Sequence, residues 1–263
     1  MNFLKLTVIA AVMASATMGV KSATTDNSLQ TPQVIAHRGF WKSEGAVQNS
    51  RASLKAALAL GVYGSETDVW ITTDGHLMVN HDPTFDGVRL QDESSDICTA
   101  LTLGNGEKMP QLFEELAIVS ESGSPTKLIL EVKDHGNRTN DVRAAKAAVA
   151  AVRAAGLQDR VDYISFSTDA CETIIAEDPD ARVGYLKGGF APAELHKKGY
   201  SSIAYHMNEL RNNPAWVKEA HDLGMKVNVW TVNTPEEMAE MRDKGVDYIT
   251  TDDPLTLISI LEK

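Results

Sequence analysis

Short apolar runs alternate with longer stretches of helical periodicity along most of the chain. Eight runs rich in Val, Ile and Tyr begin near positions 34, 64, 127, 161, 182, 201, 226 and 247. Each is followed by a segment in which apolar residues recur every three or four positions, as on one face of a helix. Alternating strands and helices predict a parallel sheet, because a parallel strand needs a crossover connection to return to the same edge.

The boundaries follow from this pattern and from turn residues. The predicted strands are 34–37, 64–75, 127–133, 161–166, 182–187, 201–206, 226–232 and 247–252. The predicted helices are 49–61, 110–122, 139–155, 169–177, 191–198, 212–223, 235–244 and 254–262. An extra strand at 77–82 pairs with the second strand through the turn Asp74-Gly75. Residues 83–109 have no clear periodicity and are predicted to be a loop insertion after this hairpin.

Eight strand–helix units in a chain of this length predict a (β/α)8 TIM barrel with a small insertion after the strand-two hairpin. A doubly wound open sheet is the alternative. No glycine-rich dinucleotide motif follows the first strand, which counts against that alternative.

The first residues, MNFLKLTVIAAVMASATMGVKSA, predict a secretory signal, since Lys5 precedes an apolar stretch that ends in small residues. The stretch is too short and too rich in Ala for a membrane-spanning helix. We therefore expect a signal peptide at 1–22, a polar tail at 23–33 and one barrel domain at 34–263, exported to the periplasm or the medium. An exported chain can form disulfides, but the sequence leaves open whether Cys98 and Cys171 pair.

The formal net charge of −11 argues against a nucleic acid or an anionic membrane as partner, since both require clustered Lys and Arg. No segment after the leader is long and apolar enough to span a bilayer. A small molecule is thus the expected partner, and an anionic one needs a local basic site. The oligomeric state does not follow from the sequence.

Polar residues collect near the predicted carboxyl ends of the strands, where barrel enzymes build their active sites. Residues two apart on a strand share a face, so Glu66 and Asp68 point the same way, as do Glu131 and Lys133. Buried carboxylates stay ionised only if a cation or hydrogen-bond donors compensate them. Three carboxylates without thiolates suit a hard divalent cation, Mg²⁺ or Ca²⁺.

Four segments together resemble the glycerophosphodiester phosphodiesterase family: HRG at 37–39, ETDVWITTDGHLMVNHD at 66–82, LEVK at 130–133, and VWTVN with GVDYITTDDP between 229 and 254. The resemblance implies metal-dependent hydrolysis of glycerophosphodiesters to glycerol 3-phosphate and an alcohol. It implies the site residues as well: His37 and His81 as the acid–base pair, Glu66, Asp68 and Glu131 as metal ligands, Arg38 and Lys133 as phosphate contacts, and Trp230 as a pocket wall.

One segment departs from the family pattern. The family usually has Glu-Asn-Thr before the first helix, where this chain has Gln48-Asn49-Ser50. The missing carboxylate leaves the alcohol open, so a lysophospholipase D-like or phosphoinositide-type substrate is an alternative. A non-catalytic sugar-phosphate binding protein is a third possibility, which the presence of both histidines and all three carboxylates disfavours. The sequence also leaves open which histidine is the acid, with a slight preference for His81, and whether water or a substrate hydroxyl attacks phosphorus.

Overall fold

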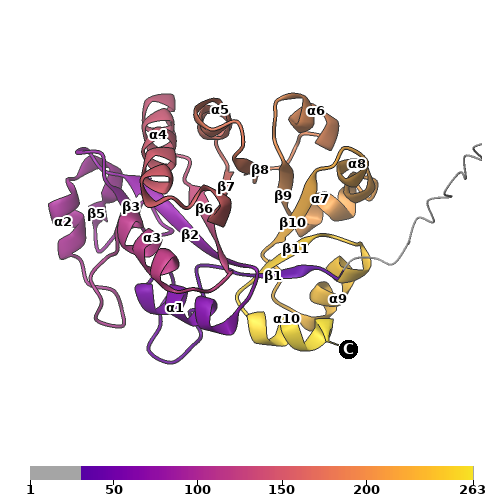
Figure 1. Cartoon of the computed structure of the whole chain (residues 1–263), viewed down its shortest axis with the longest axis horizontal. Helices are drawn as coiled ribbons and strands as arrows, with labels where there is room; N and C mark the ends of the chain where they lie inside the picture. Colours follow the sequence, from indigo (N-terminus) through magenta and orange to yellow (C-terminus); the bar gives the residue numbers. More distant parts are fainter. Residues whose placement is uncertain (1–30, 263) are drawn as a thin grey trace, which may run out of the picture.

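Eight parallel strands close into a barrel in the computed structural model, which describes residues 31–262 (Figure 1). The sheet has nine strands, and β3 alone runs antiparallel, against β2; pairing of β1 with β2 closes the ring. The barrel strands are β1 (Gln33–Ala36), β2 (Gly64–Ile71), β6 (Lys127–Val132), β7 (Val161–Ser165), β8 (Arg182–Tyr185), β9 (Ser202–His206), β10 (Lys226–Trp230) and β11 (Tyr248–Thr251). The predicted (β/α)8 fold is confirmed.

Helices follow the strands and lie outside the barrel (Figure 1). They are α1 (Arg51–Leu60), α3 (Leu112–Glu121), α4 (Arg138–Ala155), α5 (Thr168–Glu177), α6 (Pro192–Lys197), α7 (Met207–Asn212), α8 (Trp216–Asp222), α9 (Pro235–Asp243) and α10 (Pro254–Leu261), with a short 3₁₀ turn, η2 (Gln158–Arg160), before β7. Capping residues set several of their starts: the side chain of Ser50 accepts a hydrogen bond from the backbone of Ser53 at α1, and Asn137 does the same for Asn140 at α4.

Alternation along the strands divides the apolar core into two parts. Outward-facing residues such as Val34 and Leu128 pack with the helices in the main cluster. Inward-facing Ile35, Ile129 and Ile164 form a separate, smaller cluster inside the barrel. The next inward positions toward the carboxyl ends of the strands are polar, and the candidate site lies there.

The region after β2 departs from the prediction. The second hairpin strand, β3, covers only Leu77–Val79, so His81 and Asp82 lie in the loop beyond it. The predicted loop at 83–109 contains the strand pair β4 (Thr84–Phe85) and β5 (Val88–Arg89), the 3₁₀ turn η1 (Leu90–Asp92) and the helix α2 (Ser95–Ala100). Short elements of this kind leave no periodicity to detect. Distant contacts hold them, since the carboxylate of Asp74 accepts hydrogen bonds from the backbone and side chain of Ser95.

The predicted helix at 212–223 corresponds to α8, which begins four residues later, at Trp216. A separate helix, α7, ends at Asn212, and Asn213, Pro214 and Ala215 lie between the two, because a residue before proline avoids the helical conformation. Cys98 and Cys171 are both buried and free in this structure, in different apolar clusters. Among residues 31–262 no helix has the length and apolarity needed to cross a membrane. The predicted signal peptide and residues 23–30 of the predicted tail lie outside the described residues.

Candidate active site at the carboxyl ends of the strands

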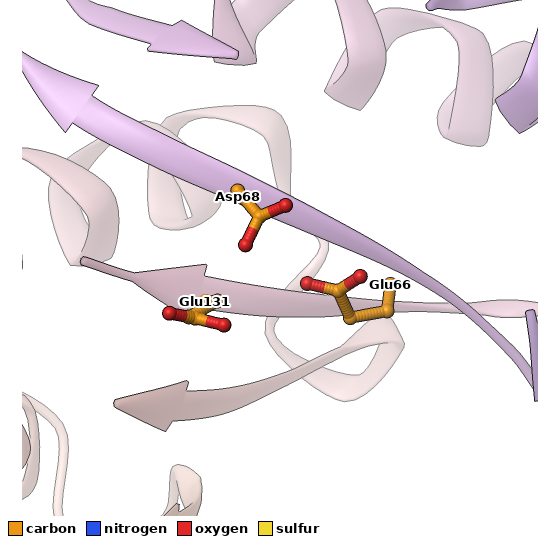
Figure 2. A group of neighbouring side chains, drawn as sticks. All are labelled: Glu66, Asp68 and Glu131. Atoms are coloured by element: carbon orange, nitrogen blue, oxygen red, sulfur yellow. The ribbon is translucent and has the colours of Figure 1, made fainter. Parts of the chain in front are cut away.

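Three buried carboxylates converge from two neighbouring strands. Glu66 and Asp68 project from the same face of β2, and Glu131 projects from β6 toward them (Figure 2). The strand register explains their meeting, because Asp68 and Glu131 are direct partners across the β2–β6 ladder. One carboxylate oxygen from each residue can be chosen so that all three lie within 4.8 Å of one another. The predicted set is thus brought together.

Burial and mutual repulsion change the acidity of this group. Burial raises the pKa of Glu66 well above its usual range, and repulsion by Asp68 and Glu131 raises it further. Burial also raises the pKa of Glu131 to about 8, with Asp68 adding to the effect. Burial opposes ionisation of Asp68 as well, but the charges of Lys133 and His81 and the hydrogen bonds from Asn49 and Lys133 together outweigh it and lower the pKa of Asp68 to about 2.

The carboxylates therefore fit a divalent cation. Within residues 31–262, Oε1 of Glu66 is buried without any hydrogen-bond donor, which is the situation of an oxygen that needs a ligand. The one ammonium group inside the cluster, Nζ of Lys133, lies 3.0 Å from Asp68 Oδ1 and 2.8 Å from Glu131 Oε1. Arg38 adds a second cation, with Nε 4.0 Å from Asp68 Oδ2, so two cationic side chains against three carboxylates leave a deficit of one positive charge. Oxygen ligands and this deficit match Mg²⁺ or Ca²⁺.

The position of Lys133 bears on its predicted role. Its ammonium group contacts carboxylates, and these contacts raise its pKa against the opposing effect of burial. The structure thus shows Lys133 as the counter-charge of Asp68 and Glu131. Its contact with phosphate stays a prediction.

Arg38 occupies a sharp turn after β1. Arg38 and Gly39 both have positive φ angles, of 55° and 76°, so the chain reverses at the end of the strand. Only glycine fits at 39, because a Cβ atom there would lie 2.5 Å from Ser53 Oγ. The turn lets the backbone N–H of Arg38 donate to Glu66 Oε2 at 2.7 Å. Nε of Arg38 is buried without an acceptor within the described residues, as expected of a donor that awaits an anion.

The three residues of the divergent segment 48–50 make three different contacts. Gln48 accepts a hydrogen bond from Arg38 Nη1 at 2.7 Å, so this guanidinium pairs with a neutral amide. Asn49 is buried and donates from Nδ2 to Asp68 Oδ2 at 2.8 Å, and this hydrogen bond orients the carboxylate of Asp68. Ser50 caps α1. Sequence reasoning treated this segment as a departure and did not assign Asn49 to the site.

His37, the last inward residue after β1, is held by a carboxylate. Its Nδ1 lies 2.8 Å from Asp252 Oδ1. An ionised carboxylate only accepts, so Nδ1 carries the proton and Nε2 is left for the pocket. Asp252 also accepts from Trp41 Nε1 and Asn233 Nδ2. Burial opposes ionisation of Asp252, but His37 and these two donors together lower its pKa to about 2. Asp252 follows the last strand in TTDDP, and the sequence analysis missed it.

His81 has a different environment in the loop after β3. Its Nδ1 lies 2.7 Å from Asp82 Oδ1, but the Asp82 side chain is 74% exposed, whereas that of Asp252 is 21% exposed. Burial and the charge of Lys133 lower the pKa of His81 below its usual 6.5. Trp70 holds this loop by donating from Nε1 to the backbone oxygen of His81.

His135 follows Lys133 by two residues and lies behind the site. Its Nε2 accepts from the backbone N–H of Ile71, and its ring packs edge-on against Trp70. His206 caps α7 and packs against Trp230 outside the lining of the catalytic cavity. The rings of His76, His196 and His221 are at the surface or in surface pairs.

Two adjoining cavities meet at Arg38 and His81. The inner one, about 110 Å³, is floored by Glu66, Glu131 and Asn228 and walled on one side by Ile164, Phe166, Leu186 and Trp230. The outer one, about 500 Å³, is bordered by the first loop and the insertion, including Trp41, Val47, Gln48, Phe85 and Leu103. A bound molecule that reached from one to the other would pass Arg38 and His81, with His37 in the lining of the inner cavity. Trp230 lies in the apolar wall, as predicted.

The chain matches known proteins over this same region. A family model described as the glycerophosphoryl diester phosphodiesterase family matches residues 37–256. A glycerophosphodiester phosphodiesterase from Caldanaerobacter subterraneus is 28% identical over 246 residues, which are 88% of this chain and 98% of that protein.

Solved structures agree. The crystal structure of a glycerophosphodiester phosphodiesterase from Parabacteroides distasonis is 43% identical, with a TM-score of 0.86 over 88% of this chain and 97% of that one. An Oleispira antarctica phosphodiesterase solved with the product sn-glycerol-3-phosphate is 24% identical, with a TM-score of 0.78 over 89% of this chain and 98% of that one. The latter likeness concerns the fold.

Proposed function

Since the chain belongs to the glycerophosphoryl diester phosphodiesterase family, we propose that it hydrolyses glycerophosphodiesters to glycerol 3-phosphate and an alcohol through the site just described. The protein is an enzyme of the phosphoric diester hydrolase class. The observation that carries the proposal is the convergence of three buried carboxylates beside two histidines and an arginine with an unpaired Nε.

Glu66, Asp68 and Glu131 hold one Mg²⁺ or Ca²⁺ in this proposal. When bound, such an ion supplies Lewis-acid stabilisation of negative charge on the phosphoryl oxygens. The chain prepares the ligands itself: Asn49 fixes Asp68, and the backbone N–H of Arg38 fixes Glu66. Fixed ligands need no rearrangement when charge develops in the transition state.

Arg38 holds the phosphate. A guanidinium carries fixed positive charge and offers donors to two oxygens at once, which suits a phosphodiester monoanion. Its Nη1 is oriented by Gln48, and its Nε remains for the substrate. Because Gln48 is neutral, it does not compete with the phosphate for the charge of Arg38.

His81 acts as the base and His37 as the acid. A base must be neutral before reaction, and the lowered pKa of His81 keeps it so near neutral pH. An acid must carry a proton, and the carboxylate of Asp252 stabilises a protonated His37 ring. His81 takes a proton from the attacking water, whose oxygen forms a bond to phosphorus while the bond from phosphorus to the alcohol oxygen breaks, and Nε2 of His37 donates its proton to that alcohol oxygen. This order reverses the slight preference for His81 as the acid.

The two cavities suggest how the substrate lies. The inner cavity, about 110 Å³ with Trp230 and Phe166 in its wall, has room for a three-carbon unit, so we place the glycerol there. The outer cavity is larger, about 500 Å³, and takes the departing alcohol. Residues of the loop after β1 and of the insertion at 83–109 then contact the alcohol and determine which alcohols are accepted.

The test is a panel of glycerophosphodiesters with different alcohols, assayed with Mg²⁺, with Ca²⁺ or with EDTA. We expect glycerol 3-phosphate from several of them and none in EDTA, with activity restored by one of the two ions. Release of phosphocholine or phosphoethanolamine instead of glycerol 3-phosphate would contradict the proposed bond cleavage. Full turnover in a metal-free preparation would contradict the metal site.

The leader supports a second part of the proposal, that the enzyme is exported. The motif is a positive residue, an apolar stretch and small residues, with Ala16 and Ser22 as possible cleavage points. Protein recovered from its host should begin between Thr17 and Thr24 and lie outside the cytoplasm. An intact Met1 on cytoplasmic protein would refute it.

A further inference from the structure

A third cavity, apart from the inner and outer cavities of the catalytic site, opens at the opposite, amino-terminal end of the barrel. It has a volume of about 190 Å³ and lies among the first residues of β7, β8, β9, β10 and β11. Barrel interiors are normally filled by layers of large side chains. Here Ser202 and Ala204 of β9 line the cavity with small side chains, which leave this end of the barrel incompletely filled.

Apolar groups form the inner part of this cavity. Ile35, Ile129 and Ile164 lie between it and the catalytic cavity, and Ala204 lines one side. The rings of Tyr63 and Tyr248, stacked with their centroids 4.4 Å apart, complete the wall. The interior therefore suits a compact apolar body.

Charged groups form its mouth, with positive charge in excess. Asp162 contacts two cations, Lys127 and Arg182, and also accepts from the hydroxyl of Tyr63. Lys226 contacts Asp247. Among the charged residues that line the cavity itself, Arg182 and Lys226 against Asp162 leave one positive charge, in a protein whose formal net charge is −11.

Two residues with donors that lack acceptors among the described residues line this cavity, and one of them, Asn228, also lines the catalytic cavity. Asn228 is 5% exposed and lines the cavity; its Oδ1 accepts from Thr250, while within residues 31–262 its NH₂ group has no acceptor. Ser202 also lines the cavity, and within the same residues its hydroxyl has no hydrogen-bond partner. Unpaired donors together with surplus positive charge call for a ligand with acceptor oxygens and negative charge.

We propose that this cavity binds a small organic anion, a carboxylate on a compact apolar body, at a site separate from the catalytic one. An apolar cavity of about 150 Å³ is known to accept a benzene ring, so a volume of about 190 Å³ has room for a ring with a carboxylate. The carboxylate lies at the mouth, near Arg182 and Lys226, and the apolar body lies on the isoleucines. Ile164 and Asn228 line both cavities and form the partition between them.

Benzoate is the probe, and an NMR titration of the ¹⁵N-labelled full chain is the measurement. We expect saturable shifts at the amides of Ser202, Ala204 and Asn228 with a Kd of ~1 mM, the range for a ligand of this size. Benzyl alcohol, which has the ring without the charge, should bind more weakly by about fivefold or more. Inorganic phosphate and glycerol 3-phosphate should not displace benzoate.

Lys226→Gln tests the mouth and Ala204→Leu tests the interior. Lys226→Gln should weaken benzoate binding about fivefold, while the matched Lys218→Gln, which also removes a lysine paired with an aspartate, changes it less than about twofold. Ala204→Leu should abolish binding by filling the cavity. The proposal is overturned if the amide shifts do not saturate even at benzoate concentrations well above ~1 mM, or if glycerol 3-phosphate displaces benzoate. It is also overturned if Lys226→Gln and Lys218→Gln change the benzoate affinity equally.

Discussion

Asp252→Asn separates the two histidines experimentally. The substitution replaces one of the two carboxylate oxygens by an NH₂ group, so the size of the side chain hardly changes. What it removes is the negative charge 2.8 Å from Nδ1 of His37. The two side chains are 17% and 21% exposed, so solvent screens this charge only in part.

The expected loss follows from the strength of such a bond. A hydrogen bond between charged groups contributes about 1.5–3 kcal/mol, which corresponds to roughly 10- to 150-fold in rate if the bond is strongest when His37 carries its proton. Asp252→Asn should therefore lower kcat by that factor on a diester of an ordinary alcohol. On the p-nitrophenyl ester of glycerol 3-phosphate, whose alcohol leaves without a proton, the loss should be small.

Asp82→Asn is the matched control, because Asp82 makes the same contact with Nδ1 of the other histidine. Asp82 is 74% exposed, and an exposed pair contributes about 1 kcal/mol at most, or up to about fivefold. Its small effect should be the same on both substrates. The assignment of His37 as the acid is refuted if Asp252→Asn loses equal factors on the two substrates, or if Asp82→Asn alone shows the dependence on the leaving group.

Three other predictions follow from the same geometry. Asn49→Ala removes a donor to Asp68 and should weaken Mg²⁺ or Ca²⁺ binding about 10- to 100-fold, measured by calorimetry, while Gln48→Ala, which contacts no metal ligand, should leave metal affinity within about twofold. Because His81 must be neutral and its pKa is lowered, the acid limb of kcat/KM should fall below pH 6.5, and a limb well above that value would contradict its role as base. Burial raises the pKa of Glu115 to about 8, so the folded protein keeps a proton that the unfolded chain releases above about pH 4.5. The free energy of unfolding should therefore fall as the pH rises from about 4.5 to about 8. Glu115→Gln should remove this pH dependence in urea titrations, and an unchanged dependence would show that Glu115 is not its source.

The sequence predicted residue positions correctly where the periodicity of a strand or helix determines them. Strand alternation puts Glu66 and Asp68 on one face, and the barrel pattern puts Glu131 on the neighbouring strand, so the carboxylate cluster could be predicted before its register was known. Periodicity does not extend past the end of a strand. His135 follows Lys133 by two positions, but β6 ends at Val132, and the chain there turns His135 behind the site.

Asp252 illustrates the other limit. The sequence presents Asp252 and Asp253 as neighbours, and nothing local says which one reaches the site. In the structure Asp253 caps α10 through the backbone of Thr256, while Asp252 faces His37, 215 positions earlier in the chain. The pairing of β1 with β11, the first and last strands of the chain, creates that contact, so only the assembled barrel identifies the residue.

The charges of the site explain why an acidic protein needs a cation to bind an anionic substrate at all. With all three carboxylates ionised, Arg38 and Lys133 leave one negative charge in excess, which repels a phosphodiester. Protons can compensate, and the raised pKa values of Glu66 and Glu131 show that they tend to, but a carboxylic acid attracts phosphate weakly. A divalent cation turns the excess into one positive charge. The metal is then a condition for substrate binding as much as for chemistry, and the affinity for the product glycerol 3-phosphate should fall with metal removal even in a His37→Ala variant that cannot turn over.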